Sequence, residues 1–102
     1  MASRNVEHIE PSLVKEWIDS GEARLIDVRE AYEHQARAIP NSELYPLSSF
    51  DPDSIVPTSQ KTLFYCRSGQ RSAQAAAIWS AHHKVPSYNL KGGILAFENY
   101  VN

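Results

Sequence analysis

The only cysteine of the chain, Cys66, lies in a short polar segment between a strand-like and a helix-like stretch. Residues 62–77 read TLFYCRSGQRSAQAAA, and the residues that follow the cysteine are Arg67, Ser68, Gly69, Gln70 and Arg71. Backbone N–H groups in such a turn, together with the N-terminus of a following helix, form a nest that attracts an anion. Nearby arginines and a helix N-terminus also lower the pKa of a thiol from about 8.5 into roughly the 3.5–7.5 range. The segment therefore predicts that Cys66 is a thiolate nucleophile at neutral pH.

An alternative interpretation is that Cys66 is an inert side chain of the core, because free cysteine is among the most buried residue types. The residues after it, Arg-Ser-Gly-Gln-Arg-Ser, are too polar for a core strand. Gly69 also permits backbone conformations that are closed to residues with a side chain. The segment therefore favours a reactive cysteine, with Arg67 and Arg71 as neighbouring positive charges.

The count of metal-ligating residues argues against a metal site. One cysteine cannot form a disulfide within the chain or supply a zinc site of several cysteines. The four histidines do not repeat a metal-ligand spacing; they are His8, His34, His82 and His83. We expect no metal and no other cofactor.

The elements that must position Cys66 alternate between strands and helices. Strands are expected at residues 6–9, 25–28, 43–45, 62–65 and 87–90. Helices are expected at residues 11–20, 30–35, 72–83 and after Gly92-Gly93, with Ser72 as the N-cap of the third and one helical turn at 47–50. This alternation predicts a parallel α/β sheet covered on both faces, with ligands at the carboxyl ends of the strands, where Cys66 lies.

Length and charge exclude several classes of protein. A chain of 102 residues has the common size of one domain, so we expect a single domain over residues 1–102. A formal net charge of −2 argues against a nucleic-acid-binding surface. No apolar run approaches the roughly 18 residues of a membrane span, and the N-terminal stretch MASRNVEHIE lacks the apolar region of a secretory signal. We expect a cytoplasmic protein without nucleic-acid or membrane partners.

Four segments in order resemble the rhodanese domain of sulfurtransferases. They are residues 25–30 (LIDVRE), Ile39-Pro40, residues 65–72 (YCRSGQRS) and residues 90–94 (LKGGI). The resemblance implies a three-layer α/β fold, with a central, mainly parallel sheet of five strands flanked by helices. It also implies that Cys66 carries a sulfane sulfur as a persulfide, cradled by the loop of residues 67–71.

Four further residues are candidates for a supporting role around this loop. Ser72 follows the loop directly. Asp27 and Arg29 are expected to be structural, as an ion pair or a buttress for the loop. Glu30 is a candidate to face the site.

The activity that the resemblance implies is transfer of sulfur from thiosulfate or a similar donor to cyanide, a thiol or a protein cysteine. Because the chain has no second cysteine, the acceptor must come from outside. The chain departs from the family at residues 37–42, which read Arg-Ala-Ile-Pro-Asn-Ser where Gly-His-Ile-Pro-Gly-Ala is usual. It also has Phe97 where tryptophan is common. These departures concern substrate fit and local stability more than the chemistry.

Other functions remain open at this stage. A cysteine phosphatase of the cell-cycle type or an arsenate reductase also uses a thiolate in an oxyanion nest. Four residues separate Cys66 from Arg71, whereas the phosphatase signature has five. A non-catalytic module that binds a partner is the second alternative, and a sulfur relay between proteins is a third. Inactive binding domains usually lack the cysteine, so the presence of Cys66 beside Arg67 and Gly69 favours sulfur chemistry.

Overall fold

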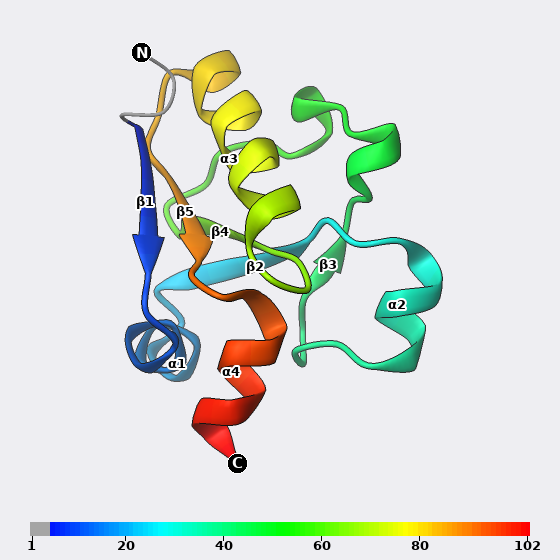
Figure 1. Ribbon diagram of the computed structural model, residues 1–102. Coiled ribbons are helices and arrows are strands. Elements are labelled where there is room, and N and C mark those ends of the chain that lie inside the picture. The colour runs from blue at the N-terminus through cyan, green and yellow to red at the C-terminus, as the bar shows by residue number, and fades with distance from the viewer. Residues whose placement is uncertain (1–4) are drawn as a thin grey trace.

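The computed structural model describes residues 5–102, which form an α/β fold of three layers (Figure 1). The elements in chain order are β1 (Val6–Ile9), α1 (Pro11–Ser20), β2 (Ala23–Asp27), α2 (Ala31–Ala36), β3 (Glu43–Leu44), β4 (Lys61–Tyr65), α3 (Gln70–His83), β5 (Ser87–Leu90) and α4 (Gly93–Val101). Two short 3-10 helices, Leu47–Ser49 and Pro52–Ser54, lie in the connection from β3 to β4. The expected order of strands and helices is confirmed, with ends that differ by one or two residues.

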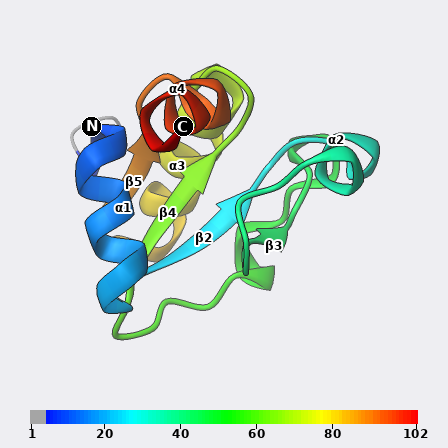
Figure 2. The ribbon, with the colours of Figure 1, turned by 90° about the horizontal axis from the view of Figure 1, so that it is seen from below.

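The five strands form one sheet in the order β1-β5-β4-β2-β3, and every described pair of neighbours is parallel. Helices α1 and α4 contribute to a hydrophobic cluster on one face, and α3 contributes to a second cluster on the other. Figure 2 shows α1 and α2 at opposite sides of the molecule, with the sheet between them. No helix within residues 5–102 is long and apolar enough to cross a membrane.

Strand β4 lies in the middle of the sheet and carries the chain to Cys66. Successive side chains of a strand point to opposite faces. Leu63 and Tyr65 accordingly join the cluster that includes α1 and α4, whereas Phe64 and Cys66 join the cluster beneath α3. All four side chains are buried, which confirms the expectation of a strand buried on both faces.

The start of α3 differs from the sequence prediction. The helix begins at Gln70, and its N-cap is Gly69, whose φ of +104° is a conformation that favours glycine. Ser72 was expected to be the N-cap because serine precedes an alanine-rich run, and this prediction was wrong. Its hydroxyl lies against Cys66 and Asn89 instead of bonding to the helix amides.

Candidate active site

The Cys66 side chain lies at the carboxyl end of β4, against the N-terminus of α3. Its Sγ accepts hydrogen bonds from the backbone N–H of Gly69 at 3.1 Å and of Ser72 at 3.4 Å. The Ser72 N–H is one of the amides at a helix start that have no partner within the helix. The sulfur takes the place that the oxygen of a capping side chain usually occupies. Negative charge on the sulfur is therefore favoured by the positive end of the helix.

Burial and hydrogen bonding act in opposite directions on the Cys66 thiol. The residue is 1% exposed, and this burial on its own raises the pKa of the thiol. The Ser72 hydroxyl, 3.3 Å from Sγ, and the backbone amides of Ser72, Gly69 and Ser68 stabilise the thiolate and lower the pKa. The hydrogen bonds outweigh the burial, and the pKa of Cys66 lies below its ordinary value. An inert core cysteine would not be surrounded by donors in this way.

Replacing Ser72 with alanine is expected to raise the pKa of Cys66 by about one unit. A hydrogen bond to a charged group contributes about 1.5–3 kcal/mol, and Asn89, the second acceptor beside the Ser72 hydroxyl, reduces this effect. The thiolate that forms below the ordinary thiol pKa in the wild type would then form only at higher pH. The ultraviolet absorbance of the thiolate, followed against pH with Cys66→Ser as the blank, measures this shift. Ser68→Ala is the matched control, because its exposed side chain is absent from the hydrogen bonds to the sulfur. An unchanged pKa in Ser72→Ala would contradict the role of the hydroxyl.

The arginines of the loop differ from the expected pair of charges beside the sulfur. Arg71 forms a bidentate ion pair with Glu33 of α2, with N···O distances of 2.8 and 3.0 Å. This hydrogen bonding lowers the pKa of Glu33 to about 2. Arg67 is exposed and is the one arginine within residues 5–102 that forms no ion pair; the others pair with carboxylates. The chief donors to the sulfur are thus amides and a hydroxyl, and Arg67 is the free cation of the loop.

Asp27 and Arg29 form a buried ion pair beside the loop, as the sequence led us to expect. The guanidinium of Arg29 donates to both carboxylate oxygens at 2.9 and 2.7 Å, and Nδ1 of His34 lies 2.8 Å from Asp27 Oδ2. Burial opposes ionisation of Asp27, but the hydrogen bonds from Arg29 and His34 hold its pKa below the ordinary value. Arg29 also donates to the carbonyl of Arg37 at 2.7 Å, so the pair joins the ends of β2 and α2.

Glu30 makes its contacts at the start of α2. It is the N-cap of α2 and forms a reciprocal capping box with Glu33. Its Oε2 accepts a hydrogen bond from the hydroxyl of Ser48 at 2.8 Å. The structure therefore places Glu30 at the start of α2, where it orders the helix that carries the partner of Arg71.

Two polar side chains of the site were missed by the sequence analysis. Asn89 of β5 is 3% exposed; its Oδ1 lies 2.5 Å from Ser72 Oγ, and its Nδ2 donates to the carbonyl of Gly69 at 3.2 Å. Glu33 is the second. Asn89 could have been found from the sequence, because it is an amide in a strand expected to end at the same sheet edge as β4, and a buried amide needs hydrogen-bond partners there. No comparable signal marks Glu33 in the sequence.

The N-terminus of α4 holds the other side of the cysteine loop. The backbone N–H of Ile94 donates to the carbonyl of Cys66 at 2.9 Å, and that of Leu95 donates to the backbone carbonyl of Arg67 at 3.3 Å. Gly93, at φ +65°, permits this approach, since a Cβ on it would lie 2.3 Å from the Arg67 carbonyl oxygen. The loop is thus held between the starts of two helices.

The segment that departs from the usual family pattern is held to the fold through Ile39 and Ser42, while Arg37, Pro40 and Asn41 are exposed. The backbone N–H of Ile39 donates to the hydroxyl of Tyr65 at 3.1 Å, and the hydroxyl of Ser42 lies 2.8 Å from the same oxygen. Arg37 forms an ion pair with Glu98 of α4 at 2.6 Å. Phe97 is buried in the hydrophobic cluster of that face.

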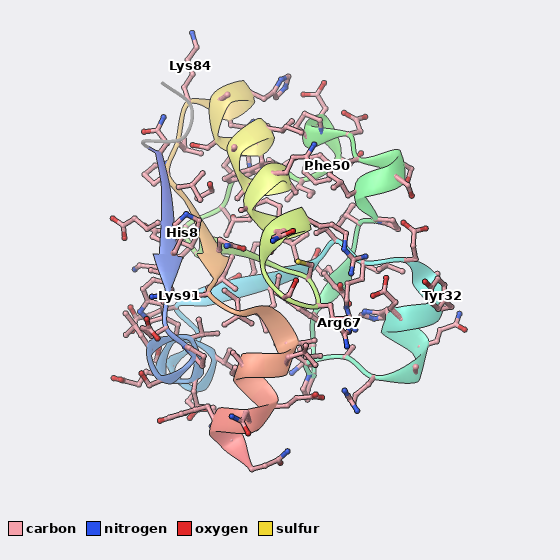
Figure 3. The ribbon with its side chains drawn as sticks, viewed as in Figure 1. His8, Tyr32, Phe50, Arg67, Lys84 and Lys91 are labelled. Carbon is pink, nitrogen blue, oxygen red and sulfur yellow. The ribbon has the colours of Figure 1, made fainter. Side chains whose placement is uncertain are left out.

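A pocket of about 320 Å³ opens beside the cysteine loop, between α2 and α4. It is lined by Arg29, Tyr32, Glu33, Ala36, Arg37, Arg67, Ile94 and Leu95. Figure 3 shows Arg67 at the loop and Tyr32 further out on α2. No group of three or more potential ligands within residues 5–102 could hold a metal ion.

A family model described as Rhodanese-like domain matches residues 10–100. The chain belongs to this family. The "Probable adenylyltransferase/sulfurtransferase MoeZ" of Mycobacterium tuberculosis is 32% identical over 93 residues, which are 87% of this chain and 24% of that protein. A protein named "Sulfurtransferase" from Allochromatium vinosum is 31% identical over 90 residues, 87% of this chain and 84% of that one. The rhodanese-like domain described here thus spans about a quarter of MoeZ and most of the Allochromatium protein.

Solved structures agree with the architecture. The human single-domain sulfurtransferase TSTD1 superposes with a TM-score of 0.78 at 21% identity, over 90% of this chain and 95% of that one. At this identity the likeness shows the fold. The expected rhodanese-like sheet of five strands flanked by helices is confirmed, and within residues 5–102 the sheet is entirely parallel.

Proposed function

We propose that this rhodanese-like domain is a sulfurtransferase that takes sulfane sulfur from thiosulfate, or a similar donor, onto Cys66. The observation that carries the proposal is the ring of donors around Sγ, made by the amides of Gly69 and Ser72 and the Ser72 hydroxyl. These groups stabilise a negative charge on sulfur at a position that is otherwise buried. Named sulfurtransferases among the relatives support the same reaction class.

In the first step the Cys66 thiolate attacks the outer sulfur of thiosulfate. A sulfur–sulfur bond forms to Cys66, the bond between the two sulfurs of thiosulfate breaks, and sulfite leaves with the electron pair. The new persulfide carries its negative charge on the terminal sulfur. The same helix N-terminus that favours the thiolate would favour this charge.

In the second step a nucleophilic acceptor attacks the terminal sulfur of the persulfide. With cyanide, a carbon–sulfur bond forms, thiocyanate leaves, and the Cys66 thiolate is restored. A thiol or a protein cysteine would instead take the sulfur as its own persulfide. The cycle needs one cysteine and no cofactor, and the acceptor comes from outside the chain.

The pocket beside the loop is the proposed site of entry for the donor. A thiolate repels an anionic donor, so the approach needs a positive charge that is not already neutralised. Arg67 fits this requirement because it has no carboxylate partner within residues 5–102, whereas Arg71 is held by Glu33. Arg37 lines the same pocket with its guanidinium paired to Glu98. In this proposal Arg67 binds the sulfonate of thiosulfate, and Arg71 orders the loop through α2.

Intact-mass measurement tests the proposed cycle directly. Incubation with thiosulfate should add the mass of one sulfur atom to the protein, and later addition of cyanide should remove it and release thiocyanate. A mass that does not change with thiosulfate in excess would contradict the proposal. If cyanide does not remove the added sulfur, the proposal would hold only for its first step, the transfer of sulfur to Cys66.

Phosphate transfer is the alternative that the loop length argues against. A phosphoryl group presents three equatorial oxygens that need donors, whereas a persulfide presents one sulfur. We expect the wild type to turn over thiosulfate and to show no measurable hydrolysis of para-nitrophenyl phosphate. A variant with one glycine inserted after Gly69 should be weaker in sulfur transfer. Phosphatase turnover that depends on Cys66 and equals the sulfur-transfer rate would support the phosphatase function instead.

The intact-mass measurement also distinguishes the proposed enzyme from a module that only binds a partner and from one that relays sulfur between proteins. A binding module would not become persulfurated, whereas a relay would load from a protein persulfide and only slowly from thiosulfate. The expected cytoplasmic location and the absence of nucleic-acid and membrane partners stay predictions.

A further inference from the structure

The hydroxyl of Ser72 lies between two acceptors. Its Oγ is 2.5 Å from Oδ1 of Asn89 and 3.3 Å from Sγ of Cys66. A serine hydroxyl has one hydrogen to donate and two lone pairs that can accept. It can therefore make a full hydrogen bond to Asn89 or to the sulfur, but not to both at once. The shorter distance favours donation to Asn89.

The orientation of the Asn89 amide is fixed by its other contacts. Its Nδ2 lies 3.2 Å from the carbonyl oxygen of Gly69, which can only accept, and 3.0 Å from Nδ1 of His8. The amide nitrogen must therefore face Gly69, and the amide oxygen must face Ser72. Because Asn89 is 3% exposed, water does not compete for these contacts.

We propose that Asn89 is a positioning residue that competes with the Cys66 sulfur for the single hydrogen of the Ser72 hydroxyl. When Cys66 is a thiol, Ser72 donates to Asn89 and its free lone pair accepts the S–H. When Cys66 is a thiolate, the hydroxyl hydrogen turns toward the sulfur. On ionisation the S–H proton leaves to solvent and the hydroxyl hydrogen turns from Asn89 to the sulfur. With no hydrogen left between them, Ser72 Oγ and Asn89 Oδ1 must then move apart from 2.5 Å. The inference rests on the proposed function only in treating Cys66 as the reactive group.

A consequence of this competition is that Asn89 restrains ionisation of Cys66. Each thiolate that gains the Ser72 hydrogen bond takes it from Asn89, so part of the stabilisation is lost. Removing the acceptor oxygen of Asn89 should free the Ser72 hydrogen for the sulfur and lower the pKa of Cys66. Removing Ser72 should raise that pKa. A purely structural role of Asn89 predicts the opposite sign, because a loosened Gly69 would weaken the amide donation to the thiolate.

Charged groups around this chain of hydrogen bonds come from each neighbouring element. Arg71 on α3 is paired with Glu33 on α2, and Asp27 on β2 is paired with Arg29. Arg67 lies in the loop itself. Figure 3 shows His8 on the edge strand β1. Its Nδ1 lies 3.0 Å from Nδ2 of Asn89. A His8→Gln variant, titrated in parallel, controls for the contribution of His8 over the whole pH range.

A double-mutant cycle on the pKa of Cys66 tests the proposal. The thiolate absorbance is titrated in the wild type, Asn89→Ala, Ser72→Ala and the double variant, with a Cys66→Ser blank for each. We expect Asn89→Ala to change the pKa of Cys66 by a value about one unit more negative in the presence of Ser72 than in the Ser72→Ala background. Equal shifts in the two backgrounds would overturn the proposal, because Asn89 would then act without Ser72.

A second substitution keeps the test decisive if Asn89→Ala does not fold. Asn89→Asp retains an acceptor oxygen near Ser72, and its charge should hold the Ser72 hydrogen more strongly. The Ser72-dependent part of the shift is the shift measured with Ser72 present minus the shift measured in the Ser72→Ala background. For Asn89→Asp this part should raise the pKa of Cys66, whereas for Asn89→Ala it should lower it. A Ser72-dependent part that is zero or negative would overturn the proposal. The readout needs no sulfur donor, so its result is independent of whether thiosulfate is a substrate.

Discussion

Cys66→Ser is expected to reduce thiosulfate:cyanide sulfur transfer to the level of the uncatalysed reaction. A serine hydroxyl is not ionised at neutral pH and cannot form a persulfide, so neither step of the cycle can proceed. The chain has no other cysteine that could replace Cys66. The measurement is thiocyanate production at saturating thiosulfate, compared between wild type and variant at equal protein concentration.

The loss of activity should not come from loss of the fold. The serine oxygen is smaller than sulfur, but it can accept the same hydrogen bonds from Gly69 and Ser72, so the polar atom is not left unpaired. The thermal unfolding midpoint and the circular dichroism of the variant should remain close to those of the wild type. Turnover near the wild-type rate in a folded Cys66→Ser protein would remove the basis for the proposed function.

The framework of the site could be predicted because its signals are local in sequence. The β-branched and aromatic residues 62–65 of β4, the polar turn after Cys66 and the alanine-rich α3 each occupy consecutive residues. Together they place the thiol at the carboxyl edge of a buried strand and at the start of a helix. The ion pair of Asp27 and Arg29 is similarly local, two residues apart.

The contacts that tune the sulfur could not be predicted because their partners are distant in sequence. Arg71 meets Glu33 across 38 positions, and Ser72 meets Asn89 across 17. Nothing in the sequence near Arg71 shows that a carboxylate on another helix would neutralise it. Serine is also a preferred N-cap, and this local preference led to the wrong start for α3. Tertiary contacts, and not helix propensity, determine the role of Ser72.

The second large effect is expected from Gly93→Ala. The backbone of Gly93 has φ +65°, which costs a non-glycine residue roughly 1–2 kcal/mol, and the new Cβ would lie 2.3 Å from the carbonyl oxygen of Arg67. Since that contact is with backbone, α4 or the cysteine loop must shift. The hydrogen bond from Ile94 to Cys66 would be lost with this shift. We expect a loss of about 3 kcal/mol in the free energy of unfolding and a fall of more than about 10 °C in the unfolding midpoint.

Sulfur transfer by folded Gly93→Ala protein should fall as well, because the moved loop no longer directs its amides at Sγ. Gly21→Ala is the matched control: its φ of +76° carries a similar backbone cost, but no atom lies within 4 Å of the added Cβ. That variant should lose about 1 kcal/mol and keep its rate of thiocyanate production per folded molecule. Urea unfolding and turnover, measured on both variants, separate the strain of a left-handed backbone from the collision with the loop. Equal losses of stability and activity in the two variants would show that the close approach of α4 to the loop has no part in holding the site.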